Sequence, residues 1–179
     1  NTATAGQTVY IRAGTYNETL RPANSGTAGN LITFKAYPGE GCNGVFAQPK
    51  TAGSCKVILD GANSLGTAID AYPRSFVRFE GVEIRNYIGD AVYLKGYHDP
   101  GTEDIQIVNN YIHHNGGDAI TLRGEGERNA LIENNEIYAN GTTAISVGGG
   151  SGHIIRGNNI HYNGKDGVRG GGDSLLIEY

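Results

Sequence analysis

Apolar residues recur along the chain in short alternating runs, and these runs repeat. Four segments share one pattern, and they are FEGVEI (79–84), IVNNYI (107–112), IENNEI (132–137) and IRGNNI (155–160). Each is followed at a constant distance by a second apolar run, and these are AVYL (91–94), AITL (119–122), AISV (144–147) and GVRG (167–170). Short alternation of apolar and polar residues predicts β-strands, and no run has the spacing of an amphipathic helix.

The length of the repeat indicates the architecture. Intervals of 28, 25 and 23 residues separate the leading residues, which are Phe79, Ile107, Ile132 and Ile155. Similar spacing extends the series downstream to Ile177 and upstream to Ile58, Phe34 and Ile11. Strands this short, at this repeat length, predict a solenoid with three strands per turn. We therefore expect residues 1–179 to form one all-β domain, a right-handed parallel β-helix of about eight coils.

Asparagines support this stacking independently, because they fall at two repeated positions. One register contains Asn110, Asn135 and Asn158, and the other, three residues after each closing Ile, contains Asn115, Asn140 and Asn163. Asn tolerates the left-handed conformation at a corner, and stacked amide side chains can hydrogen-bond one another in a ladder. We expect two structural ladders with no catalytic role. His113 and His114 lie beside one corner without an evident partner.

Composition and charge narrow the function classes. The 29 glycines are about twice the usual share, which indicates many tight turns. The net charge of −4 provides no basic surface for nucleic acid, and no apolar run approaches the ~20 residues of a membrane span. The chain begins at Asn1 without an initiator Met, as a processed or truncated protein would. We expect a fragment of something longer or an open-ended solenoid.

The two cysteines bear on the compartment. Cys42 and Cys55 bracket a Gly- and Pro-containing stretch, and neither belongs to a CxxC motif or has a His nearby. We expect a disulfide that closes the loop 42–55, as in a secreted protein. The alternative is two free thiols in a cytosolic protein.

Variation in length is confined to one connection of each coil. It takes 15 residues from Val92 to Ile107, 12 from Ile120 to Ile132 and 10 from Ile145 to Ile155. Insertions in solenoids collect on one face, which is often the binding face. A binding site is therefore expected beside these loops.

The outer surface of the later strands, next to those loops, forms the candidate trough. Alternation turns Val92 and Leu94 inward, and the residues expected to face solvent along one line are Asp70, Tyr93, Lys95, Thr121, Arg123, Ser146 and Arg169. Cations, an aromatic face and hydroxyls suit an anionic sugar chain. The predicted substrate-binding residues are Tyr93, Lys95, Tyr97, His98, Arg123 and Arg169. The alternative is an ordinary solvated sheet face.

Two trough residues are candidates for catalysis. Lys95 directly precedes Arg123 in the stack. A β-elimination needs a base and a cation that stabilises the substrate carboxylate, and these two side chains could supply them.

The N-terminal coils resemble a known family. The stretch GQTVYIRAGTYNETL (6–20), with NSGTAGNLITFKAYPGE (24–40) and VILDG (57–61), is similar to the opening coils of secreted β-helix polysaccharide lyases, in particular the chondroitinase-B and alginate-lyase type. The resemblance implies a secreted enzyme that acts on an acidic polysaccharide. Many lyases of this fold hold Ca²⁺, and Asp90, Asp118 and Asp166 share a register that could supply oxygen ligands. Alternatively, these Asp residues accept backbone N–H bonds.

Two other function classes fit the same sequence. The terminal coils of a β-helix have unpaired backbone groups, so the chain could be a structural solenoid that associates end to end into filaments. It could also be a glycan-binding or adhesin module without catalysis.

Overall fold

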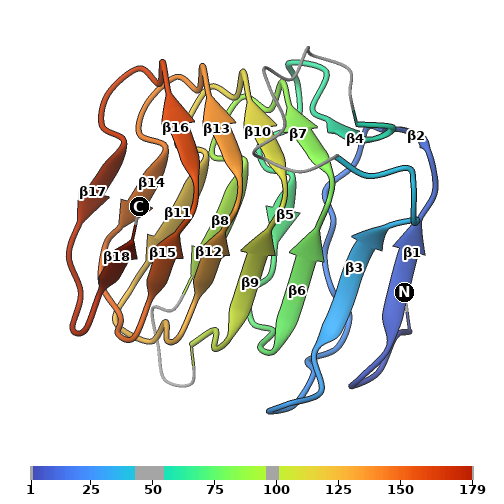
Figure 1. Ribbon diagram of the computed structural model, residues 1–179, viewed down its shortest axis with the longest axis horizontal. Helices are drawn as coiled ribbons and strands as arrows, with labels where there is room; N and C mark the ends of the chain where they lie inside the picture. The colour runs from blue at the N-terminus through green and yellow to red at the C-terminus, as the bar shows by residue number, and fades with distance from the viewer. Residues whose placement is uncertain (1, 43–54, 96–100, 179) are drawn as a thin grey trace.

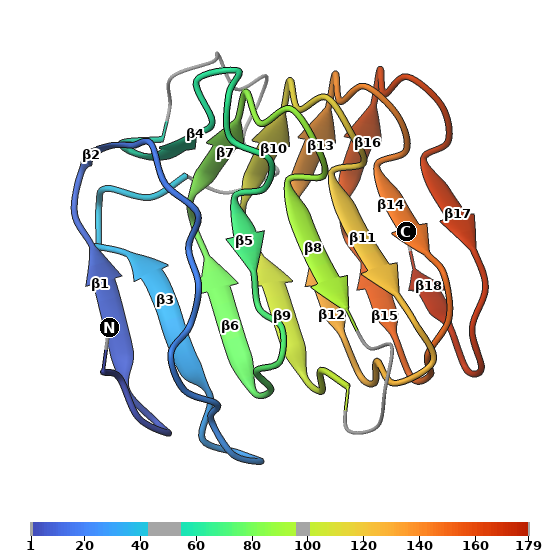
Figure 2. The ribbon, with the colours of Figure 1, turned by 180° about the vertical axis from the view of Figure 1, so that it is seen from behind.

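The computed structural model describes residues 2–42, 55–95 and 101–178, and within these ranges its regular elements are β-strands alone. The chain coils so that successive turns stack on one another, with three parallel sheets around a shared interior; Figures 1 and 2 show this from opposite sides. The described ranges contain no helix that is long and apolar enough to cross a membrane.

Each sheet takes one strand from successive coils. Sheet A contains β1 (Thr8–Ile11), β3 (Ile32–Ala36), β6 (Val77–Glu80), β9 (Ile105–Val108), β12 (Leu131–Glu133), β15 (Ile154–Arg156) and β18 (Leu176–Glu178). Sheet B contains β2 (Gly14–Tyr16), β4 (Val57–Asp60), β7 (Glu83–Arg85), β10 (Tyr111–His113), β13 (Glu136–Tyr138) and β16 (Asn159–His161). Sheet C contains β5 (Ile69–Asp70), β8 (Val92–Lys95), β11 (Ile120–Arg123), β14 (Ile145–Val147) and β17 (Val168–Gly170).

The predicted solenoid with three strands per coil is confirmed, but the number of coils is smaller. The described strands number seven, six and five in the three sheets, which is about six turns rather than eight. The early coils are longer than the later ones, since Phe34 pairs in register with Phe79, 45 residues on. A constant spacing therefore overcounted the coils.

The predicted column of leading residues is confirmed in its later part. Strand register in sheet A joins Phe79, Ile107, Ile132, Ile155 and Ile177. Two upstream assignments are wrong. Ile58 lies in sheet B, beside Glu83, and Ile11 pairs with Ala36, whereas Val9 stands beside Phe34. A single apolar residue does not reveal which of the three sheets its strand joins.

The interior is filled by the inward residues of all three sheets. Phe34 and Phe79 stack with ring centroids 5.5 Å apart, and Ile107, Ile132 and Ile155 continue that column with at most 2% exposure. Each fully buried aliphatic side chain stabilises the fold by about 2 kcal/mol relative to the exposed state. The coils are therefore held by contact between equivalent positions as well as by backbone hydrogen bonds.

Both predicted asparagine ladders are present at the corners. At the corner between sheets A and B, Asn110 Nδ2 donates to Asn135 Oδ1 at 3.2 Å, and Asn135 Nδ2 donates to Asn158 Oδ1 at 2.9 Å. The corner between sheets B and C repeats this through Asn115, Asn140 and Asn163. Each amide also bonds backbone groups, so it satisfies buried polar atoms that the turn removes from the sheets.

The left-handed backbone conformation, however, does not belong to the ladder residues. It occurs one position earlier in each corner, at Asn109 and Asn134 in one ladder and at His114, Ala139 and Tyr162 in the other, with φ between 51° and 58°. The preceding residue therefore makes the turn and directs the following amide inward.

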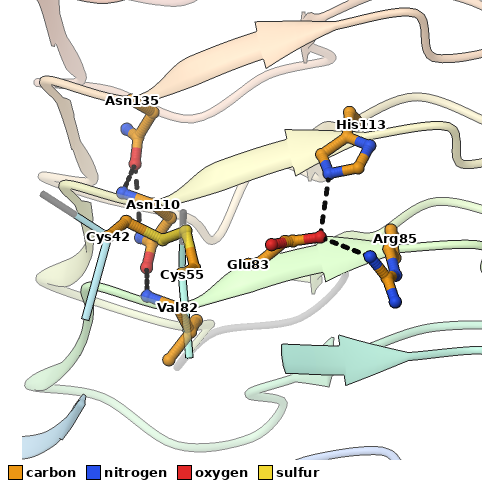
Figure 3. The surroundings of a disulfide bond; sticks show 8 residues. All are labelled: Cys42, Cys55, Val82, Glu83, Arg85, Asn110, His113 and Asn135. Carbon is orange, nitrogen blue, oxygen red and sulfur yellow. Dashed lines mark hydrogen bonds and ion pairs between the residues drawn. A yellow bond between two sulfur atoms is a disulfide. The ribbon is translucent and has the colours of Figure 1, made fainter. Parts of the chain in front are cut away.

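The predicted disulfide between Cys42 and Cys55 is also present (Figure 3). Both cysteines are buried, and they pack with Tyr111 on the outside of sheet B. The disulfide thus covers part of that outer face.

We predict that Asn135→Ala destabilises the protein by about 3 kcal/mol or more. The substitution leaves the buried Asn110 N–H without its acceptor, 2.9 Å away, and the Ile107 carbonyl without its donor, 2.8 Å away. Chemical denaturation followed by circular dichroism measures the loss. Asn24→Ala removes a bond of exposed groups and serves as the control; equal losses for both variants would contradict a special role of the ladder.

We also predict that Gly141→Ala destabilises the protein by about 1–3 kcal/mol or more, because a Cβ there would collide with the backbone carbonyl of Gly116 in the coil below. At Gly66 a Cβ would meet nothing within 4 Å, so Gly66→Ala is the matched control. Thermal melting of both variants tests how closely the corners stack. A Gly141→Ala melting temperature equal to that of the parent would refute the close approach.

Candidate functional site

The outer face of sheet C carries one column of side chains across five coils. Backbone register places these residues in line, and they are Asp70, Tyr93, Thr121, Ser146 and Arg169. Neighbouring members are therefore one strand spacing apart, about 4.8 Å. This is the backbone arrangement that the candidate trough requires.

The members of this column differ in accessibility. Arg169 is exposed, its Nη2 donates to Ser146 Oγ at 3.3 Å, and it lies 3.8 Å from Asp118 Oδ2. Thr121 is buried, and its hydroxyl donates to Asp90 Oδ2 at 2.9 Å. The expectation that Thr121 faces solvent is therefore wrong, since neighbouring carboxylates cover it.

The two candidate catalytic residues are neighbours in backbone register. Arg123 at the end of β11 pairs with Lys95 at the end of β8. Arg123 is exposed, and no ion pair joins it to another residue of the described ranges. Tyr97 and His98 lie outside the described residues, and their predicted binding roles stay predictions.

The aspartates proposed as calcium ligands are used in the corner itself. Asp90 Oδ1 accepts the Asp118 N–H at 2.9 Å, and Asp118 Oδ1 accepts the Thr143 N–H at 2.9 Å and the Thr142 hydroxyl. Asp166 lies 3.9 Å from Arg169. Within the described ranges, no three His, Cys, Asp or Glu residues are arranged to hold a metal ion. These aspartates do not fit a calcium site, because their oxygens already satisfy donors of the next coil.

The connections of variable length stack along one edge, as expected. Isolated bridges join Glu103 to Arg128, Arg128 to Ser151, and Ser151 to Asp173. A depression of about 390 Å³ lies among them and is lined in part by Glu125, Arg128 and Asp173. This edge borders the end of β11 at Arg123.

Two ionisable groups lie buried in these connections, and sequence reasoning missed both. Glu127 is 1% exposed, and neither carboxyl oxygen accepts a hydrogen bond of normal geometry in the described ranges. Burial raises the pKa of Glu127 to about 9, against weaker opposite effects of the Arg123 backbone and Thr102. Burial also lowers the pKa of His153, whose Nδ1 accepts the Ala130 N–H. Both groups are therefore uncharged at neutral pH.

The Glu127 pKa leads to a prediction about stability. Between its ordinary pKa and about 9, the folded chain keeps a proton that the unfolded chain has lost, so stability falls as pH rises and levels off above about 9. Glu127→Gln cannot ionise. The variant should gain stability over the parent from about pH 5 to about pH 9, by at most about 1.4 kcal/mol per pH unit. Denaturant titrations at several pH values measure this, with exposed Glu125→Gln as the control. A pH-independent difference would contradict the raised pKa.

A second set of ionisable residues, on the outer face of sheet B, was also missed. Glu83 is fully buried, and its Oε1 lies 2.8 Å from Arg85 Nη1 and 3.3 Å from His113 Nε2. The expectation that His113 has no partner is therefore wrong. Its partner lies one coil earlier, 30 residues away, and the alternation in EIR (83–85) and YIH (111–113) could have revealed it.

The fold agrees with a known family. Residues 58–171 match the family described as the right handed beta helix region. The chain belongs to this family. Over 190 aligned residues it is 27% identical to pectate lyase PEL9 of Emericella nidulans, across 93% of this chain and 42% of that protein. A 38-residue stretch is 58% identical to the uncharacterized protein YwoF of Bacillus subtilis, across 21% of this chain and 8% of that protein.

Among solved structures, that of pectate lyase Pel9A matches with a TM-score of 0.66 at 18% identity, covering 98% of this chain and 45% of that one. The chain thus spans less than half the length of these relatives. The comparisons confirm the predicted β-helix fold and the likeness to polysaccharide lyases built on it. The finer resemblance to the chondroitinase-B and alginate-lyase type stays a prediction.

Proposed function

We propose that this chain binds an acidic polysaccharide along the outer face of sheet C, as part of a secreted polysaccharide lyase-like protein. The observation that carries the proposal is the register of this face. It aligns Tyr93 with Thr121, Ser146 and Arg169, and it places Lys95 beside Arg123. The pectate lyases among the relatives support the class of ligand.

The chemistry of this face suits a chain of uronic acid residues. A guanidinium binds a carboxylate through two parallel hydrogen bonds, and a tyrosine ring offers an apolar surface to one face of a sugar. Arg123 is exposed and Arg169 is bound only through Ser146 and aspartates at 3.8 and 3.9 Å, so both cations are accessible to a ligand. A solenoid repeats such contacts along its axis, which matches a polymer with repeated charges.

Lys95 and Arg123 are the residues that we propose for a β-elimination. One side chain would remove the proton next to the uronate carboxylate while the other stabilises the charge that develops there. Their neighbouring positions on β8 and β11 support a shared substrate residue. The Cys42–Cys55 disulfide supports secretion, because such bonds persist in oxidising compartments.

We expect Arg123→Ala to raise the dissociation constant for polygalacturonate by about tenfold, since a charged hydrogen bond is lost. Calorimetric titration at low and high salt measures this, and binding should weaken with salt. Arg156→Ala is the matched control, because Arg156 pairs with Glu133 on sheet A. Similar losses in the two variants, or no binding by the parent, would contradict a site on sheet C.

Turnover is tested separately. The chain is incubated with polygalacturonate, alginate and chondroitin sulfate, with and without Ca²⁺, while the ultraviolet absorbance of unsaturated products is recorded. A rise that Lys95→Met abolishes supports the elimination. Saturable binding without any rise would refute the elimination and leave a glycan-binding module.

A further inference from the structure

The outer face of sheet B contains a hydrogen-bonded chain of three side chains that the sheet C site does not use. It begins at Glu83 in β7, continues through His113 in β10 and ends at His114 in the following corner. Figure 3 shows Glu83 between Arg85 and His113, beside the disulfide. The chain thus leads from a buried carboxylate to the surface.

Glu83 is the fixed end of this chain. It is 0% exposed, and its Oε1 accepts from Arg85 Nη1 at 2.8 Å and faces His113 Nε2 at 3.3 Å, while Oε2 has no partner in the described ranges. A buried carboxylate is strongly stabilised by donors, so His113 is held with a proton on Nε2. This fixes the tautomer of a neutral His113.

The contact between the two histidines then determines the second tautomer. Nδ1 of His113 lies 2.7 Å from Nδ1 of His114, which leaves room for one proton between them. Because His113 already carries its proton on Nε2, Nδ1 of His114 donates and Nδ1 of His113 accepts. Nε2 of a neutral His114 is left as a hydrogen-bond acceptor.

His114 presents this acceptor at the surface. It is exposed, it adopts a left-handed conformation with φ of 55°, and it borders a depression of about 490 Å³ at the corner between sheets B and C. Asn63 lines the same depression, together with Ile88, which is 59% exposed. An imidazole acceptor, an amide and an exposed aliphatic surface suit a sugar ring, which has hydroxyls at its edge and apolar C–H groups on its faces.

We propose that this corner depression is a second sugar-binding subsite, in which His114 Nε2 accepts a hydrogen bond from a sugar hydroxyl and the Glu83–His113 pair holds His114 in the accepting tautomer. His114 is the binding residue, and Glu83 and His113 are positioning residues. The choice of a sugar rests on the proposed function, whereas the tautomer follows from the contacts alone.

The protonation states agree with this assignment. The groups that face His114 are His113, Tyr138 and, at longer range, Arg85 and Glu83. Burial, followed by the charges of His113 and Arg85, lowers the pKa of His114 below its ordinary value. His114 is therefore neutral at pH 7 and able to accept.

The protein contains an internal comparison two coils further on. His161 Nε2 lies 2.6 Å from Glu136 Oε1, which repeats the Glu83–His113 pair, but Tyr162 stands at the position equivalent to His114. Nδ1 of His161 has no partner in the described ranges. Tyr162 shares the exposure of His114 and its φ of 55°. This second pair provides controls that alter the same kind of contact away from the depression.

The tautomer is tested by long-range ¹H–¹⁵N spectra of the histidine rings in the full chain. The parent should show His114 protonated on Nδ1 and bare on Nε2 at pH 7, and Glu83→Gln should mix the two tautomers. Glu136→Gln should leave the His114 signals unchanged. A His114 protonated on Nε2 in the parent would overturn the proposal.

Binding is tested by titration with trigalacturonate, using the Ile88 methyl signal for the corner and the Arg123 Nε–H signal for sheet C. Both signals should shift saturably. His114→Asn, which suits the left-handed backbone, should weaken the Ile88 response about fivefold, and Tyr162→Asn should not. If Arg123 shifts and Ile88 does not, the corner subsite is refuted while the sheet C site stands. An Ile88 shift without an Arg123 shift would refute the sheet C site alone.

Discussion

The parallel, in-register hydrogen bonding between successive coils is the constraint on which the rest of the structure depends. It places equivalent positions of every coil one strand spacing apart, about 4.8 Å. An Ile at one such position contacts the Ile of the next coil, and an Asn bonds the next Asn. The same constraint acts on the glycines that follow the ladder asparagines, where Gly116, Gly141 and Gly164 leave no room for a side chain.

This constraint separates the molecule into a uniform interior and variable outer faces. Inward positions must fill a shared core, so they are aliphatic or aromatic in every coil. Outward positions need only be compatible with the neighbour above and below. Sheet C uses them for Tyr93 and Arg169, and sheet B uses them for Glu83 and His113. Recognition of a ligand therefore depends on the outward columns and the corners next to them.

The sequence predicted most where a feature repeats in every coil. The Ile107, Ile132 and Ile155 column and both Asn ladders could be read from spacing, because the repeat itself is the signal. Ile58 was misplaced, since a lone apolar residue in a long, irregular coil is compatible with any of the three sheets. The contact between Glu83 and His113 was missed for a related reason. It is diagonal and occurs between different residue types, so no repeated letter marks it.

Two buried glutamates illustrate why the sites depend on more than register. Glu83 has Arg85 and His113 as donors, so it can keep its charge without contact with water and orient a histidine. Glu127 has no such donors, and burial raises its pKa to about 9, which leaves it uncharged at neutral pH. The first glutamate can hold a proton on a neighbouring ring, whereas the second makes the adjoining connection sensitive to alkaline pH. The neighbours supplied by the coil above or below therefore decide what an identical residue does.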